Sequence, residues 1–190
     1  MPPVTQSLLI ANVMVFLAQM FGGSPLVGWF ALWPDENFEP LQLVTYSFLH
    51  GGLPHLFFNM LGLYMFGSDV ERLFGTRFYL AYYFASVVAA ALLHLAVSAL
   101  MGADAAPMVG ASGGIYGLLL AFGWYFPQRR VVLLFPPIPM KARTFVIVFG
   151  ALELFFGVTG TAAGVAHFAH LGGMLGGWLM IEYRRGRFSR

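Results

Sequence analysis

One serine of this chain has the surroundings that a nucleophile requires. Ser112 stands in the segment MVGASGGIYG, between Gly110 and Gly113, where a loop enters an apolar run. A serine nucleophile needs an unobstructed hydroxyl and backbone N–H donors for an oxyanion, and small neighbours at a helix N-terminus supply both. A GxSG motif is weak evidence alone, because glycine and serine also gather where membrane helices pack closely. The prediction therefore depends on a base elsewhere in the chain.

A histidine late in the chain is the candidate base. His170 lies in GVAHFAHLGGMLGG, 14 residues before Arg184, and Ser112 lies 17 residues before Arg129. At a helical rise of about 1.5 Å per residue, the two side chains stand about 21 and 25 Å above these basic residues, and therefore at similar depth. His94 has a similar depth too, so depth alone does not select the base. We treat His94 as a packing residue.

A second polar pair, His55 and Asn59, could stabilise negative charge on a reacting oxygen. The two residues are four positions apart in HGGLPHLFFNML and therefore share one helix face, at about the depth of Ser112. Neutral imidazole and amide N–H groups are suitable donors in a site of low dielectric. Taken alone, such a pair is more often two hydrogen-bonded packing residues.

Glycines on two segments would let the serine and the histidine meet. GxxxG spacing allows two helix backbones to approach closely, and a hydrogen bond between side chains on two helices requires that approach. The same spacing also serves packing alone, and both uses can hold together. The pairs are Gly113 with Gly117, Gly172 with Gly176, and Gly173 with Gly177.

The composition places these residues in a membrane. Of the 190 residues, 59% are hydrophobic and 9% are charged, and the mean hydropathy is +0.76, whereas soluble domains carry about 25% charged residues. At about 20 residues per span, the chain has room for about six helices. We expect an all-α polytopic membrane protein with a single domain, residues 1–190. The predicted spans are Gln6–Met20, Pro54–Phe74, Phe78–Met101, Ser112–Phe126, Arg143–Phe156 and Gly164–Tyr183.

The ten basic residues predict the orientation. All of them lie at the junction of the second and third predicted spans, at the junction of the fourth and fifth, or after the sixth, and none lies in the loops after the first, third and fifth. By the positive-inside rule, an even number of spans leaves both termini in the cytoplasm. Topology accounts for the net charge of +2, so nucleic-acid binding is set aside. The basic residues are Arg72, Arg77, Arg129, Arg130, Lys141, Arg143, Arg184, Arg185, Arg187 and Arg190.

Two further features limit the chemistry. There is no cysteine, and no HExxH motif accompanies the histidines, so we expect no metal and no cofactor. Glu153 is a carboxylate expected in the fifth span, where it must be protonated or hydrogen-bonded. The long connection over residues 21–52 is rich in aromatic, acidic and proline residues, which predicts a segment in the outer interface.

Together these segments resemble the rhomboid intramembrane serine proteases. The resemblance covers residues 41–177 and rests on HGGLPHLFFNM, VERLFG, GASGGIYG and AHFAHLGG in this order, and LFPPIPMK is similar to bacterial members. It implies a six-helix rhomboid bundle in which Ser112 is the nucleophile and His170 the general base, without an acid. His55, Asn59 and the Ser112 N–H would form the oxyanion hole. His170 rather than His167 fits the AHxxG element, because Gly173 follows it by three residues.

The resemblance assigns supporting roles as well. His50 corresponds to a histidine that orders the first outer loop, and Tyr116 to an aromatic residue that stacks on the base. Glu71 with Gly75 would form a structural element of the inner turn. Leu41-Gln42 stand where the family often has Trp-Arg, which puts the structure of the outer loop in question rather than the chemistry.

The predicted function is hydrolysis of a peptide bond in or near a transmembrane segment of another membrane protein. The partners are therefore such substrates and the lipid bilayer, with the oligomeric state open. The resemblance implies a preference for a small residue before the cut bond. We expect a bacterial inner membrane location, with the site opening outward. The alternatives are an inactive relative that binds membrane clients, which would characteristically lack the serine or histidine, and a transporter, which would need polar residues through both leaflets.

Overall fold

The computed structural model describes residues 1–22, 24–101, 107–133, 136–160 and 166–188. Most of the described chain is helical, so the predicted all-α class is confirmed. Gly164 and Arg190, which belong to the predicted sixth span and the last basic cluster, lie outside the described residues.

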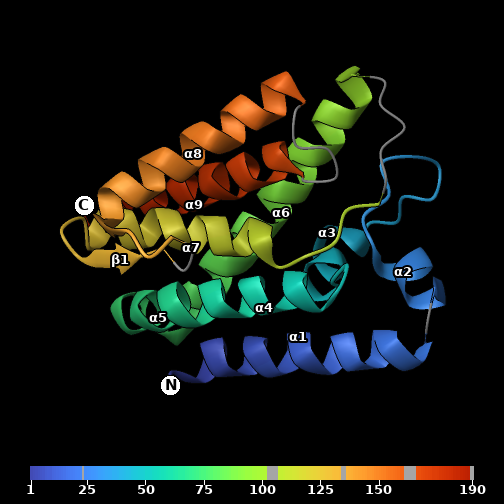
Figure 1. The fold of residues 1–190 in the computed structure, drawn as a ribbon, viewed down its shortest axis with the longest axis horizontal. Helices are drawn as coiled ribbons and strands as arrows, with labels where there is room; N and C mark the ends of the chain where they lie inside the picture. Colours follow the sequence, from blue (N-terminus) through green and yellow to red (C-terminus); the bar gives the residue numbers. More distant parts are fainter. Residues whose placement is uncertain (23, 102–106, 134–135, 161–165, 189–190) are drawn as a thin grey trace.

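Six long helical segments make up the described bundle, and each predicted span falls on one of them (Figure 1). The second is continuous but contains a π-helical turn, η2, between α4 and α5. The sixth begins at His167, somewhat later than predicted. The segments are α1 (Pro3–Gly22), α4 (Leu53–Gly62) with η2 (Leu63–Gly67) and α5 (Ser68–Phe74), α6 (Thr76–Met101), α7 (Ser112–Tyr125), α8 (Ala142–Thr159) and α9 (His167–Phe188).

Three of these helices are long and apolar enough to cross a bilayer by themselves: α1, residues Thr76–Leu100 of α6, and α8. The other three segments differ in kind. One is divided by η2, α7 has only 14 residues, and α9 is rich in glycine and carries charges in its last turns. The three apolar helices identify an integral membrane protein, and the count of six spans stays a prediction.

Short elements fill the connections. The connection between α1 and α4, which the sequence predicts to be the first outer connection, contains α2 (Ser24–Phe30), α3 (Gln42–Thr45) and the single turn η1 (Tyr46–Phe48). Strands β1 (Arg130–Val132) and β2 (Pro139–Lys141) form an antiparallel hairpin between α7 and α8, with Arg130 opposite Lys141. The start of α1, the hairpin and the end of α9 lie at one end of the bundle, whereas α2 and α3 lie at the other (Figure 1).

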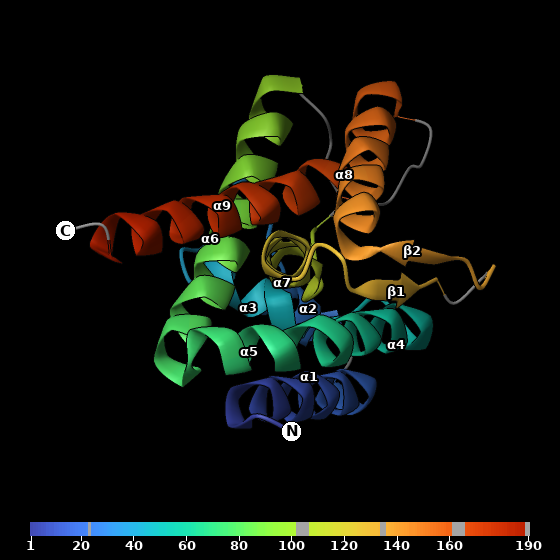
Figure 2. The same ribbon diagram turned by 90° about the vertical axis from the view of Figure 1, so that its left-hand side faces the viewer.

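Helix α7 lies at the centre of the bundle, and Figure 2 shows it end-on with the other long helices around it. Its small residues allow this position. A Cβ added at Gly173 of α9 would stand 2.0 Å from the Gly113 carbonyl oxygen, and one at Gly177 would stand 3.2 Å from the Gly117 Cα. The predicted glycine faces of α7 and α9 therefore meet, which brings the first turns of the two helices together.

The turn between α5 and α6, which is the predicted inner turn, is held by a buried carboxylate, Glu71. Its two oxygens accept hydrogen bonds from the backbone N–H groups of Val4 and Thr5, at 2.9 and 2.7 Å, and from the Thr5 hydroxyl at 2.7 Å. These N–H groups belong to the first turn of α1, where no intrahelical acceptor exists. Gly75 ends α5 with φ 77°, a conformation that favours glycine. The inner turn is thus tied to the N-terminus of α1.

Candidate active site

Ser112 is the first residue of α7, the central helix of the bundle (Figure 2). The N–H groups of a first helical turn have no acceptor within the helix, so they can bind an anionic oxygen there. The preceding Gly110 has φ 125°, which disfavours any residue with a side chain. Gly110 donates its N–H to the Tyr46 carbonyl at 3.0 Å, which fixes the approach of the chain to Ser112.

His170 contacts this serine directly. Its Nε2 lies 2.8 Å from Ser112 Oγ, although 58 positions separate the residues in the sequence. The Tyr116 ring, one turn after Ser112, stacks on the imidazole with a centroid distance of 4.2 Å and an interplanar angle of 5°. The structure thus brings together three residues that the sequence assigned to one site, at the contact between α7 and α9.

His55 lies beside this pair on α4. A Cβ added at Gly110 would stand 2.8 Å from His55 Nε2, so this edge of the ring faces the residue two positions before Ser112. The Gly51 N–H donates to His55 Nδ1 at 3.2 Å. A neutral imidazole whose Nδ1 accepts a hydrogen bond carries its proton on Nε2. His55 therefore presents an N–H donor toward Gly110, at the approach to the serine.

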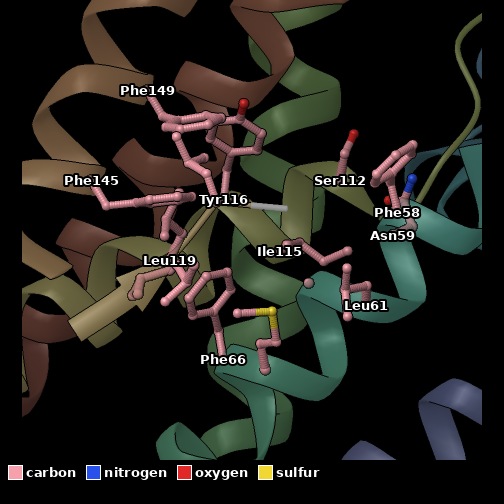
Figure 3. Close-up of a pocket in the computed structure, with 15 residues that line it drawn as sticks. Phe58, Asn59, Leu61, Phe66, Ser112, Ile115, Tyr116, Leu119, Phe145 and Phe149 are labelled. Atoms are coloured by element: carbon pink, nitrogen blue, oxygen red, sulfur yellow. The ribbon is translucent and has the colours of Figure 1, made fainter. Parts of the chain in front are cut away.

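Asn59 lies one turn further along α4 and lines the same cavity as Ser112 (Figure 3). Its Nδ2 donates one hydrogen to the His55 carbonyl at 2.8 Å, which leaves a second N–H on the amide. The side chain is buried, and no described group bonds to its Oδ1. The Asn59 amide thus has a second N–H hydrogen that can be donated to a further partner.

His50 is buried behind His55, with the two rings edge to face at a centroid distance of 5.1 Å. Gln19 of α1 clamps its backbone: the Gln19 Oε1 accepts from the His50 N–H at 3.0 Å, and Nε2 donates to the carbonyl at 3.2 Å. Burial, together with the neighbouring His55, lowers the pKa of His50 to about 4. His50 is therefore neutral at pH 7 and links the outer connection to α1.

Glu153 of α8 was not expected at this site. Its Oε1 lies 3.0 Å from His170 Nδ1, and its Oε2 lies 2.6 Å from His167 Nδ1. The Tyr116 hydroxyl also donates to Oε1. The resemblance implied a base without an acid, and the structure differs here by putting a carboxylate beside it. One feature of the sequence pointed to such a carboxylate. His167 and His170 share a face of the predicted sixth span, and the N–H groups of two histidines within a membrane require a hydrogen-bond acceptor.

An apolar cavity of about 360 Å³ extends from Ser112 along the bundle (Figure 3). Its walls are α4 with η2, α7, the start of α8, and the β1 segment. A cavity with this lining can hold apolar side chains, and Ser112 and Asn59 bring polar groups to it. Its aromatic walls are Phe58, Phe66, Tyr116, Phe145 and Phe149.

Known proteins resemble the chain over most of its length. The family model described as the Rhomboid domain matches residues 37–187. The chain is 30% identical to the RHOMBOID-like protein 12, mitochondrial, of Arabidopsis thaliana, over 97% of this chain and 60% of that protein. It is 31% identical to the Rhomboid protease GluP of Bacillus subtilis, over 87% of this chain and 31% of that protein. With the Rhomboid protease GlpG of Yersinia pestis (strain Pestoides F), the identity is 24%, over 94% of this chain and 61% of that protein.

The chain therefore spans 31% to 61% of the length of these three relatives. The region matched by the family model begins before α3 and ends within α9, so it contains Ser112, His170 and all the other site residues described above except Gln19 of α1. This match, the helical bundle and the order of the motifs agree: the chain belongs to the rhomboid family.

Proposed function

We propose that this protein is an intramembrane serine endopeptidase that cleaves transmembrane segments of other membrane proteins. The observation that carries the proposal is the 2.8 Å contact between Ser112 Oγ and His170 Nε2. It lies at the start of a central helix and beside an apolar cavity. Two relatives are named as rhomboid proteases, which supports the same reaction.

The first half of the reaction forms an acyl-enzyme. Ser112 Oγ attacks the carbonyl carbon of the substrate and gives its proton to His170 Nε2. The new C–O bond moves the carbonyl π electrons onto the oxygen. His170 then returns the proton to the leaving amine nitrogen as the C–N bond breaks.

Water completes the reaction. His170 takes a proton from the water as its oxygen attacks the acyl carbon, and returns the proton to Ser112 Oγ as the ester bond breaks. Both tetrahedral intermediates carry an oxyanion. Its donors in this proposal are the Ser112 N–H, the Nε2–H of His55 and the free N–H of Asn59, and loss of one such donor typically lowers kcat by about 10² to 10³-fold.

The cavity supports a route for the substrate. It runs between α4 with η2 on one side and α8 on the other, and apolar and aromatic side chains line most of it. Side chains of a transmembrane helix are mostly apolar. In this proposal the substrate segment therefore lies between α4 and α8, with its reacting carbonyl at Ser112.

The proposed setting is a bacterial inner membrane, with both termini cytoplasmic and the site opening outward. The start of α1 and the end of α9 lie at the same end of the bundle, which agrees with an even number of spans (Figure 1). A cytoplasmic reporter fused after Arg190 is expected to be active, and the same reporter in the first outer connection inactive. An inactive reporter after Arg190 contradicts this orientation.

The decisive test of the activity is separate replacement of Ser112 and His170. We expect Ser112→Ala and His170→Ala, purified in detergent, to lose cleavage of a transmembrane test substrate. Ser112→Ala should also lose labelling by a fluorophosphonate. Matched controls are Ser7→Ala, at an exposed serine of α1, and His94→Asn, outside the described site; both should cleave. Cleavage that survives Ser112→Ala would sink the proposal, whereas a wild-type protein that neither cleaves the substrate nor reacts with the fluorophosphonate would favour an inactive relative that binds membrane clients.

A further inference from the structure

The imidazole of His170 has a partner on each side. Nε2 faces Ser112 Oγ at 2.8 Å, and Nδ1 faces Glu153 Oε1 at 3.0 Å. We propose that Glu153 is a positioning residue, which orients His170 and selects the tautomer in which Nε2 accepts the serine proton. This inference rests on the proposed protease function and adds an acid to the serine and the histidine.

The burial of Glu153 is the first observation that needs an explanation. Its side chain is 10% exposed and lies in an apolar helix, where an unpaired carboxylate has a large desolvation cost. An ionised carboxylate accepts hydrogen bonds only, at about four lone-pair positions. Here three groups with donor hydrogens surround it: the Tyr116 hydroxyl, His167 Nδ1 and His170 Nδ1. The surroundings thus suit a carboxylate.

The tautomer of His170 is the second step. Nε2 can accept the Ser112 proton only if the neutral ring carries its hydrogen on Nδ1. A carboxylate beside Nδ1 favours that form, and it also stabilises the imidazolium that develops as the serine attacks. The proton stays on the ring throughout, so Glu153 neither gains nor loses one.

The resting geometry leaves room for the contact to tighten. The distance from Nδ1 to Oε1 is within hydrogen-bond range, but the N–H direction is off the line to the oxygen, and no directed hydrogen bond to Nδ1 forms in the described structure. The contact is therefore mainly electrostatic in this state. Catalytic hydrogen bonds are often poorly aligned before substrate binds and shorten afterwards.

Tyr116 couples the carboxylate to the base. Its ring stacks on His170, while its hydroxyl donates to the oxygen that faces the same imidazole. His167, which lies one turn before His170 on α9, pairs with the second oxygen at 2.6 Å. The carboxylate is consequently fixed from α7 and from α9, and its position relative to His170 is set by two independent contacts.

A purely structural role is the competing explanation, since Glu153 also connects α8 with α7 and α9. The two roles differ in what they predict for kcat. A structural clamp changes the folded fraction and the melting temperature, with kcat per folded molecule retained. A positioning residue changes kcat with little effect on KM, because the substrate does not contact it.

The experiment compares Glu153→Gln with wild type and with Glu71→Gln. Glu71 is a second buried carboxylate, at the opposite end of the bundle, so this control makes the same chemical change away from the site. An amide at 153 can turn its NH₂ toward Nδ1 and favour the wrong tautomer. We expect kcat of Glu153→Gln to fall by about 10²-fold or more, with KM within about threefold. Glu71→Gln should lower the melting temperature and keep kcat.

Two further variants sharpen the outcome. Glu153→Asp retains the charge at a shorter reach, so its kcat should lie between those of wild type and Glu153→Gln. If Glu153→Gln does not fold, Tyr116→Phe decides the matter, because it keeps the stacked ring and removes one hydroxyl. We then expect kcat about tenfold lower at unchanged KM, which corresponds to the loss of one hydrogen bond.

The outcomes separate this inference from the proposed function. If Ser112→Ala abolishes cleavage while Glu153→Gln keeps the wild-type kcat, the positioning role is overturned and the protease proposal stands. If Glu153→Gln does not fold, a wild-type kcat in Tyr116→Phe likewise overturns the positioning role and leaves the protease proposal standing. Cleavage that survives Ser112→Ala overturns both. A fluorophosphonate reaction that slows in Glu153→Gln in parallel with kcat supports the positioning role, since this reagent needs the serine and the base but no transmembrane substrate.

Discussion

Replacement of Gly110 by alanine tests whether the approach to Ser112 is built around His55. Gly110 has φ 125°, and a Cβ at this position would stand 2.8 Å from both Cε1 and Nε2 of the His55 ring. Ordinary carbon contacts begin at about 3.5 Å, so the ring must move by about 0.7 Å or the Gly110 backbone must yield. A donor displaced by this distance no longer makes a normal hydrogen bond.

The expected effect has two parts. If His55 donates to the oxyanion, its displacement should lower kcat by about 10²-fold, the lower value for loss of one such donor. The unfavourable φ of alanine should lower the free energy of unfolding by about 1 to 3 kcal/mol. Gly75→Ala is the matched control, because Gly75 has φ 77° and open space at its Cβ. That variant should be destabilised and keep kcat.

The assay is cleavage of a transmembrane test substrate by monodisperse protein, repeated in a His55→Ala background. If the penalty acts through His55, Gly110→Ala should lower kcat by no more than about threefold once the ring is absent, while the loss of stability persists. Two results would refute this reasoning: a wild-type kcat in the single variant, or the same fold-loss of kcat with and without His55.

Three further predictions concern positions around the site. Gln42 is buried and bonds to Trp33, Trp29 and Asn37 of the outer connection. Gln42→Ala should therefore lower the free energy of unfolding by about 2 to 3 kcal/mol and speed proteolysis of this connection. An unchanged rate of proteolysis would contradict this prediction. The lowered pKa of His50 makes the unfolded state bind more protons between pH 6.5 and 4. Stability should therefore fall by up to about 3 kcal/mol as pH decreases through this window, and His50→Gln should show a smaller pH dependence by thermal unfolding. In Gly173→Ala, the added Cβ would stand 2.0 Å from the Gly113 carbonyl oxygen, so α9 must move away from α7 by about 1.5 Å. Cleavage should therefore be lost even where folded protein is recovered.

The main geometry of the site could be predicted from the sequence because motif and helical spacing constrain it. Ser112 and His170 stand near the starts of two helices whose glycines must pack, and the glycines of α7 and α9 do meet. Gln42 in place of an arginine put the outer connection in question. The structure shows that its amide bonds to the backbone of that connection at three places.

Glu153 could not be located in the same way. Counting the helical rise from the inner basic residues puts it about 15 Å above them, well below His170. That count assumes straight helices normal to the membrane, and it carries no information on which face of α8 meets α9. The side chain reaches His170 because α8 packs against α7 and α9 with this face inward. Tilt and rotation of a helix are set by its neighbours, which one sequence does not specify.

The short length of α7 links the outer connection to the chemistry. Its 14 residues extend about 21 Å, less than the about 30 Å of a hydrocarbon core. In the predicted six-span topology, the backbone before Ser112 is therefore non-helical at membrane depth, which is tolerated only where other groups satisfy its hydrogen bonds. Met108 exchanges both backbone bonds with Leu32, at 2.9 and 3.0 Å, and Gly110 bonds to Tyr46. These partners belong to the first outer connection, so changes there should disturb the segment that leads into Ser112 even where no side chain of that connection contacts the substrate.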